Sequence, residues 1–315
     1  MMMRKLLKAA LLSMMAAVWM TSTSTLKAEE EQTALQRIQE RGVLEVAVYA
    51  DFPPFSYRGE RGRIVGIDVD IAHALAKRLG VVAAIRAVGA DENMEDDLRN
   101  NVWKGHYLGG GVADVMLHTP FDEAFAEEND RVSFIAPYYR EQIVFAVVAD
   151  KAGRGSPLEI FTREKIGVEL DTLADFYLLT AYSGRIRDQV VHYRNMNEAV
   201  AALKAGELSG VAGPRSEIEF ALGESKSGYA VGPIKMPGMR SSGWDLGAAV
   251  RQGNEQLANA LDQAMIEVRE TGELQKIFEK HGSSYQLPSR IVRLKPESSG
   301  VIAYSDDAKL CLRRP

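Results

Sequence analysis

Short apolar runs and amphipathic runs alternate along most of the chain. The run from Leu44 to Tyr49 predicts a buried strand, and residues 68–79 predict a helix whose apolar side chains recur at i, i+4 and i+8. Asp68 is a candidate cap for this helix, and Gly80 follows it as a stop. Further along, the pattern predicts a strand over Leu208 to Ala212 and helices from Asn195 or Asn197 to Ala205, from Asn254 to Gly272 and from Glu273 to His281. Such alternation with short loops predicts open parallel sheets flanked by helices.

Two sheets are expected rather than one. Val144 to Val148 and Leu246 to Val250 are further apolar runs, and each lies beside a point where the chain would cross from one sheet to the other. The region after Ser284 contains Pro288 and Pro296 and is expected to be loop-like, with an edge strand over Val301 to Tyr304.

The first 28 residues have the pattern of a secretory signal. Arg4, Lys5 and Lys8 precede the apolar run from Ala9 to Met20, and Leu26-Lys27-Ala28 forms a cleavage site. The run is too short for a bilayer, which needs about 20 apolar residues. No Cys stands at the cleavage point, so we expect a mature chain that is free in the periplasm and carries no lipid anchor.

Composition excludes some partners and some sources of stability. The formal net charge of −5 argues against a nucleic-acid partner, because such proteins usually carry a basic patch. Cys311 is the single cysteine, so no intrachain disulfide can form and packing must stabilise the fold.

The loop after the first strand concentrates aromatic and proline residues. It reads Asp51-Phe52-Pro53-Pro54-Phe55 and leads through a polar turn into the first long helix. Loops lie at the surface, so rings placed on one indicate a binding role. Phe52 is the expected stacking residue, and Tyr49 and Asp51 beside it are candidates to bond a polar ligand group.

This segment resembles the opening of the periplasmic solute-binding proteins of family 3, the amino-acid type. Later pieces agree in order: Val112 to Met116 matches a strand of that family, Phe134 to Tyr139 is similar to its "FSxPYY" motif, and Lys165 to Val168 is similar to the opening of its second lobe. The resemblance covers residues 33–284 and implies an α/β, two-lobed type II periplasmic binding protein fold. Two open, mainly parallel sheets would be joined by a two-strand hinge.

The resemblance also implies a domain organisation. After the signal peptide (1–28), lobe 1 would comprise residues 29–139 and 245–284, with lobe 2 at 140–244 and a C-terminal extension at 285–315. The chain would leave lobe 1 near Tyr139 and return near Trp244. The ligand would lie between the lobes, where strand ends and helix N-termini converge.

Both charged anchors of the family's amino-acid site are missing. An Arg normally clamps the α-carboxylate, but its position holds Asp122 or Glu128 in the two available registers, and Arg131 is the nearest candidate. The Asp that normally holds the α-ammonium is replaced by Pro214, followed by Arg215. A buried charge without a partner is costly, so the sequence predicts a ligand other than a standard α-amino acid.

The remaining site candidates fall into two groups. Trp103, His106 and Tyr107 lie in a segment that is longer and more aromatic than in the family, and form either a lid over the site or a local satellite core. Candidates at strand ends complete the set of predicted ligand-contacting residues: His118, Thr119, Asp171, Thr172, Pro214 and Arg215.

Three functional hypotheses follow. The first is solute binding without catalysis, cofactor or metal, with a small molecule and an inner-membrane ABC permease as partners. The second is an accessory role beside a periplasmic PQQ-dependent, methanol-type dehydrogenase, as in the MoxJ/XoxJ subgroup that the chain resembles in character. Enzymatic motifs are absent: the chain has no HExxH, CxxC or GxSxG, and its Gly109-Gly110-Gly111 run lacks the P-loop Lys. A metal site formed by His106, His118 and an Asp is the remaining alternative.

Overall fold

The computed structural model describes residues 32–151, 157–239, 241–289 and 291. The predicted signal peptide, Cys311 and the strand predicted over Val301 to Tyr304 lie outside these residues. Within the described part, no helix is long and apolar enough to cross a membrane.

The first sheet contains the strands that open the chain. β1 (Val43–Tyr49) lies between β4 (Val82–Val88) and β5 (Val115–Pro120) and is parallel to both. Its core takes residues from both ends of the chain, because α2 (Ala34–Arg41) and α3 (Ile67–Arg78) pack there together with α10 (Glu255–Glu270) and α11 (Glu273–Lys280). The predicted apolar face of α3 is confirmed, since Ile71, Ala72, Leu75 and Ala76 are buried.

The second sheet comes from the middle of the chain. β7 (Ile166–Glu169) lies between β8 (Val190–Tyr193) and β9 (Gly210–Pro214) and is parallel to both. Two hydrophobic cores accompany this sheet. One contains residues of α7 (Leu173–Thr180), and the other contains residues of α8 (Met196–Lys204) and α9 (Arg215–Leu222).

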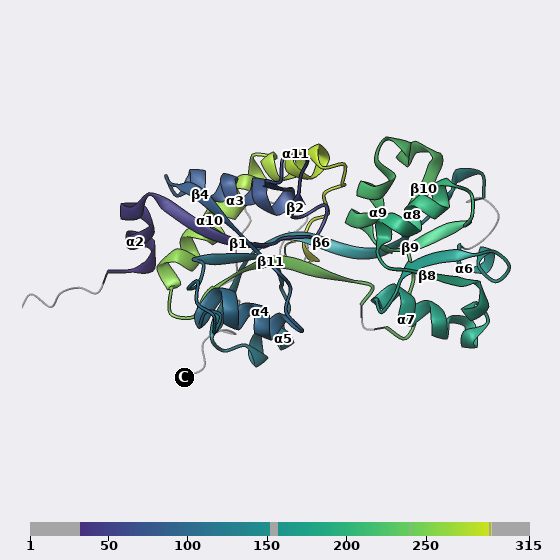
Figure 1. Ribbon diagram of the computed structural model, residues 1–315, viewed down its shortest axis with the longest axis horizontal. Coiled ribbons are helices and arrows are strands. Elements are labelled where there is room, and N and C mark those ends of the chain that lie inside the picture. Colours follow the sequence, from purple (N-terminus) through teal and green to yellow (C-terminus); the bar gives the residue numbers. More distant parts are fainter. Residues whose placement is uncertain (1–31, 152–156, 240, 290, 292–315) are drawn as a thin grey trace, which may run out of the picture. The chain divides into compact units, whose positions relative to one another are not determined.

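One long strand belongs to both sheets. β6 (Val132–Val148) pairs with β11 (Gly243–Arg251) up to Gln142, and from Ile143 onward it pairs with β9 and with β10 (Tyr229–Pro233) (Figure 1). All pairs that β6 and β11 make are antiparallel, whereas the outer strands of each sheet are parallel. The predicted class, α/β with mainly parallel sheets, is confirmed, and β6 is the strand that pairs in both sheets.

Polar side chains mark several helix starts. Asn93, Asp122, Thr172 and Asn195 each accept a backbone N–H at the start of their helix. The cap predicted at Asp68 is wrong: Gly66 is the capping residue, and Asp68 lies inside the first turn of α3 with its side chain fully buried.

The remaining elements are short. They are the hairpin β2 (Tyr57–Arg58) and β3 (Ile64–Val65), α4 (Met94–Leu98) with a π-helical turn over Arg99–Trp103, α5 (Glu123–Glu128), α6 (Pro157–Ile160), and 3₁₀ turns at Ala149–Lys151, Ala181–Gly184, Arg187–Gln189 and Gly223–Gly228.

Candidate ligand site

Four rings from β1, β5 and the first loop pack together; we call them the aromatic wall: Tyr49, Phe52, Phe55 and His118. The ring centre of His118 lies 4.6 Å from that of Phe52 and 4.3 Å from that of Phe55. Tyr49 packs against both Phe52 and His118 at 6.1 Å. The structure therefore brings together three of the predicted site residues.

The wall has one accessible side. Phe52 keeps 38% of its surface exposed, whereas Phe55 keeps 1%. The loop is held by Phe52, whose backbone N–H donates to Ser56 O at 2.7 Å, and by the close approach of Gly66. A Cβ on Gly66 would lie 2.2 Å from Phe55 O, so only glycine fits there. Phe52 is thus a supported ring that still presents surface to a ligand.

His118 occupies a bulge in β5. Gly247 of β11 pairs with Thr119 and Ala248 pairs with Leu117, so His118 is the extra residue. Its φ of 63° is in the left-handed region, which is uncommon for residues other than glycine. Bulges re-aim side chains near functional sites, and here the bulge turns the imidazole into the wall.

Beneath the wall, His118 contacts a fully buried carboxylate. The His118 Nδ1 atom lies 3.3 Å from Asp68 Oδ2. Tyr138 donates its hydroxyl to Asp68 Oδ1 at 2.8 Å, and the backbone N–H of His118 donates to the Tyr138 hydroxyl oxygen at 3.1 Å. Burial, and then the nearby Asp68, raise the pKa of Tyr138, so this hydroxyl remains a donor.

Tyr49 is already engaged and is a poor candidate to bond a ligand. Its hydroxyl donates to Asp97 Oδ2 at 2.7 Å, and burial followed by this hydrogen bond raises the pKa of Tyr49. Burial also raises the pKa of Asp97. Asp51, on the other side of Phe52, is exposed.

The predicted lid residues divide between core and surface. Trp103 is partly buried and packs against the core beside β1 and β5, which agrees with the satellite-core alternative. Tyr107 is 87% exposed and stacks on His106 at 4.4 Å, with the exposed Leu108 next to it. Among the described residues, no ring contact joins these side chains to the aromatic wall.

The position expected for a carboxylate clamp carries no cation. Asp122 accepts the backbone N–H of Phe125 at 3.0 Å and caps α5, and Glu128 is exposed. Arg131 is exposed and lies beside Asp130, with Nε 3.6 Å from Oδ1.

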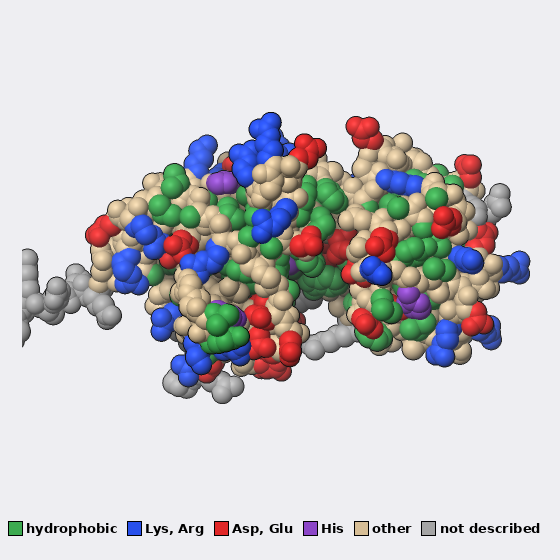
Figure 2. Space-filling model, in the orientation of Figure 1, with side chains coloured by type: hydrophobic (Ala, Val, Ile, Leu, Met, Phe, Trp, Pro, Cys, Tyr) green, Lys and Arg blue, Asp and Glu red, His purple; other side chains and the backbone are tan. Residues whose placement is uncertain are grey.

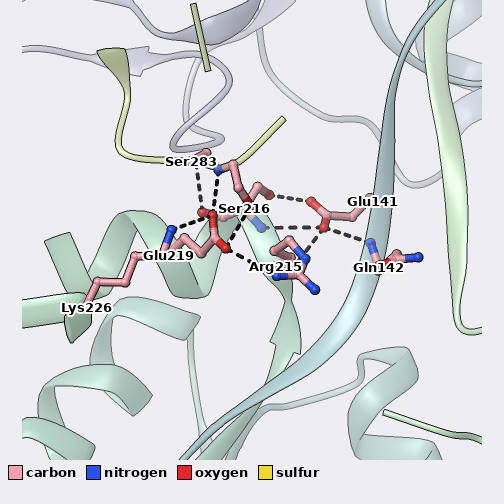
Figure 3. Close-up of polar contacts among 8 residues, drawn as sticks. Glu141, Gln142, Arg215, Ser216, Glu219, Lys226 and Ser283 are labelled. Carbon is pink, nitrogen blue, oxygen red and sulfur yellow. Dashed lines mark hydrogen bonds and ion pairs between the residues drawn. The ribbon is translucent and has the colours of Figure 1, made fainter. Parts of the chain in front are cut away.

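The position expected for an ammonium anchor is closed by the protein itself. Pro214 ends β9, and Glu141 of β6 takes up the polar groups at the start of α9 (Figure 3). Glu141 Oε1 accepts the backbone N–H of Arg215 at 3.0 Å and that of Ser216 at 3.4 Å, and Oε2 accepts the Ser216 hydroxyl. Burial raises the pKa of Glu141, although these hydrogen bonds oppose the rise.

Arg215 is also engaged within this cluster. Its Nη1 lies 3.3 Å from Glu219 Oε1, and Lys226 Nζ lies 3.0 Å from Glu219 Oε2. Ser284, in the segment after α11, donates its backbone N–H and its hydroxyl to Glu219 at 2.6 and 2.8 Å. Arg215 is therefore held by protein carboxylates.

Glu217 is a partly buried carboxylate of α9 that takes no part in this cluster. No hydrogen bond to its side chain is present within the described residues. Burial, and then the neighbouring charges of Glu169 and Glu141, raise the pKa of Glu217 well above its usual value.

At the start of α7, the two predicted residues have structural roles. Thr172 caps the helix, accepting the Asp175 N–H at 3.4 Å, and Asp171 adopts a left-handed φ of 61°. The Asp171 N–H donates to Asp175 Oδ2 at 3.0 Å, and Asp175 Oδ1 lies 2.9 Å from His192 Nε2. Thr172, and not Asp171, is therefore the capping residue of α7.

Sequence reasoning missed Asp68, Asp97, Glu141 and Glu217. For Asp68 a signal exists: it shares the helix face of Ile71, Ala72 and Leu75, so an acid was predictable on the buried side of α3. Glu141 lies within a long apolar strand. In the described residues, no three His, Cys, Asp or Glu side chains converge as metal ligands.

A separate hollow lies between α3 and α11 and is mainly basic. It is lined by Asp70, His73, Ala74, Lys77, Glu273, Lys276, Ile277 and Lys280. Figure 2 shows Lys and Arg side chains gathered over α11. Three of its charged residues are already paired: Lys280 and Asp70 with each other, and Glu273 with Arg78.

Comparisons with known proteins show which proteins this chain is similar to. The family described as bacterial extracellular solute-binding proteins, family 3, matches residues 44–103, which span β1, the aromatic loop and α3. The structure is similar to that of an ancestral cationic amino acid solute-binding protein, AncCDT-1, with a TM-score of 0.63 and 23% identity over 79% of this chain and 99% of that chain. The resemblance to family 3 is thus confirmed, and the fold is that of its two-lobed binding proteins.

Individual relatives refine this statement. The chain is 26% identical to the L-cystine-binding protein TcyJ of Escherichia coli, over 86% of this chain and 94% of the relative. It is also 44% identical to the cyclohexadienyl dehydratase of Pseudomonas aeruginosa, but over only 22% of this chain and 25% of that enzyme. The long match supports a solute-binding role, and the short one shows that an enzyme shares part of the sequence.

Proposed function

We propose that the protein is a periplasmic solute-binding protein of the ABC-transporter type. Its ligand is a small molecule with a planar or apolar part that stacks on Phe52, and it is not a standard α-amino acid. The observation that carries the proposal is the aromatic wall, in which Phe52 is exposed while the rings around it are buried. Binding pockets commonly combine apolar walls with a few convergent polar groups.

The exclusion of α-amino acids rests on the two anchor positions. Asp122 caps α5, and Pro214 precedes a helix start whose N–H groups are bound to Glu141. A zwitterion would bring a carboxylate and an ammonium to positions where no residue of opposite charge can pair with them. Each unpaired buried charge costs on the order of several kcal/mol. The domain boundaries at residues 139, 244 and 284 are part of the same proposal, as is export through a cleavable signal.

A thermal-shift screen tests this function. A ligand present at 100 times its Kd stabilises the native state by about 2.7 kcal/mol, which raises the melting temperature by several degrees. The screen covers amino acids, amines, organic acids and sugars. We expect a response outside the amino acids that is lost in Phe52→Ala and kept in the exposed control Tyr107→Ala. A flat response across all classes would refute solute binding.

A second candidate is the accessory role beside a periplasmic quinoprotein dehydrogenase. Tyr107 and Leu108, 87% and 78% exposed, favour it because they form an apolar tip on the surface. Pull-down from periplasm with wild type and with Tyr107→Ala tests it: the dehydrogenase is expected with the first and reduced with the second. Recovery of no dehydrogenase with the wild type would remove this candidate.

Catalysis is not proposed. The dehydratase match is limited to a quarter of that enzyme, and the long match is to a binding protein. Incubation of the protein with the substrate of a cyclohexadienyl dehydratase should give no product above background.

A further inference from the structure

His118 is the one member of the aromatic wall with a side chain that can be positively charged. Its ring is nearly buried, at 8% residue exposure, and packs between Phe52, in a tilted arrangement, and Phe55, edge to face. Nδ1 faces the carboxylate of Asp68 at 3.3 Å. Histidine in this arrangement is fixed in orientation by its partner, as in other carboxylate–histidine pairs.

The carboxylate that this ring faces has few other partners. Asp68 is fully buried, and a buried carboxylate needs a counter-charge or several hydrogen bonds. Its described contacts are one hydroxyl, that of Tyr138 on β6, and the ring of His118. The other titratable groups near the wall are also acidic: Tyr49 on β1 and, beneath it, Asp97 and Asp91. His118 is therefore the group that can balance this charge.

The second ring nitrogen is available to a ligand. The one polar contact of the His118 side chain within the described residues is the approach of Nδ1 to Asp68 Oδ2, which has no hydrogen-bond geometry, so Nε2 has no hydrogen-bond partner there. The neighbouring Thr119 hydroxyl is buried and has no hydrogen-bond partner within the described residues. Buried polar groups normally find partners, so this hydroxyl beside the unpartnered Nε2 points to a missing one.

The backbone supports the same interpretation. His118 is held at a φ of 63°, in the left-handed region that residues other than glycine rarely adopt. Gly247, opposite the bulge, must be glycine, because a Cβ there would lie 2.8 Å from Ile135 O. The fold thus maintains a strained histidine in a position that asparagine or glycine would adopt more easily.

We infer that His118 is the polar anchor of the site and that its Nε2–H donates to a carboxylate oxygen of the ligand. The ligand class is then an aromatic or apolar monocarboxylate without an ammonium group, its apolar part stacked on Phe52. This inference rests on the proposed solute-binding function. It assigns to β5 the role that an Arg near Asp122 would otherwise fill, while Pro214 leaves an ammonium without a partner.

Calorimetry with matched probes tests the anchor. Phenylacetate, phenylacetamide and phenethylamine share one ring and differ in the group offered to His118. At pH about 6.5 we expect phenylacetate to bind at least about tenfold more tightly than the other two, since a charge-assisted hydrogen bond exceeds a neutral one. His118→Gln should remove that preference, and the exposed control His73→Gln should keep it.

Separate outcomes refute the anchor and the function. No detectable binding of phenylacetate, or a preference for it that survives His118→Gln, overturns the anchor. If instead an amine or sugar from the thermal-shift screen binds and its affinity is unchanged in His118→Gln, solute binding stands and the anchor fails.

A measurement without ligand guards against misfolded variants. Nitrogen-15 NMR of histidine-labelled wild type should show a proton on Nε2 of His118, and Asp68→Asn should change the ring resonances of His118 while those of His73 stay the same. An Nε2 without a proton in the wild type would also overturn the inference.

Discussion

The aromatic wall and the start of α9 differ in how their polar groups are satisfied. Beside the wall, the Thr119 hydroxyl is buried without a hydrogen-bond partner among the described residues, and Phe52 keeps exposed surface. At α9, Glu141 accepts the N–H groups of Arg215 and Ser216.

The difference teaches that polar groups at the ends of strands and helices are satisfied in two ways. At α9 a protein carboxylate occupies the helix N-terminus, which would otherwise attract an anion. Beside the wall, no other described residue satisfies the Thr119 hydroxyl.

The largest effect on stability is expected from removing the Glu141 carboxylate, which satisfies the polar groups at the start of α9. Glu141→Ala leaves two backbone N–H groups and the Ser216 hydroxyl unpaired in a buried place, and we expect it to lower the free energy of unfolding by about 3 kcal/mol. Urea denaturation measures this change. The exposed control Glu127→Ala should stay within about 0.5 kcal/mol of wild type. A loss of less than about 1 kcal/mol for Glu141→Ala would contradict the hydrogen bonds from Arg215 and Ser216 to Glu141.

An intermediate effect on stability is expected from disturbing the bulge in β5 that positions His118. A Cβ at Gly247 would approach Ile135 O to 2.8 Å and the Phe121 ring to 3.0 Å. Gly247→Ala should therefore lower stability by about 1–3 kcal/mol, as overpacking does. Thermal denaturation measures this, with Gly89→Ala as control, because a Cβ at Gly89 meets nothing within 4 Å. Equal melting temperatures for the two variants would show that β11 shifts without cost.

The smallest effect concerns Glu217 and its pH dependence. Burial and the nearby Glu169 and Glu141 raise its pKa in the folded state, so the folded state binds more protons than the unfolded state between the two pKa values. Stability contributed by this group therefore falls as pH rises through that window, by less than about 1.4 kcal/mol per pH unit. Glu217→Gln should be more stable than wild type at neutral pH and equal to it below about pH 4.5.

Urea denaturation from pH about 4 to 7 measures this difference. The exposed control Glu224→Gln should follow the wild-type curve. Parallel curves for Glu217→Gln and wild type would mean that Glu217 is solvated like a surface carboxylate.

Much of the fold was predictable because its helices and strands follow periodic patterns. The face of α3 and the starts of α8 and α10 at Asn195 and Asn254 agree with the sequence. The unbroken course of β6 was not predictable, because polar residues 140–142 interrupt its apolar pattern. Pairing with β11 on one side of this point and with β9 on the other keeps the strand continuous.

The site was less predictable, because its key geometry is non-local. His118 could be named as a candidate, but its left-handed backbone depends on the register shift against β11. Its partner Asp68 is 50 positions away in the chain and was interpreted as a cap, a role that Gly66 takes instead. Tyr107 could not be separated from Trp103 by residue type, since only packing decides which ring is buried.

The first hydrophobic core, which contains residues of α2 and of α11, has a consequence for the order of folding. Ion pairs between α3 and α11, which both pack on this core, show how far apart in the chain its parts lie: Arg78 bonds Glu273 across 195 positions and Lys280 bonds Asp70 across 210. The middle of the chain, from β7 to β10, closes its sheet between much nearer segments. Long-range contacts form slowly, so the middle should collapse first and the ends should join last. A chain emerging from synthesis would keep its first core incomplete until its final helices appear.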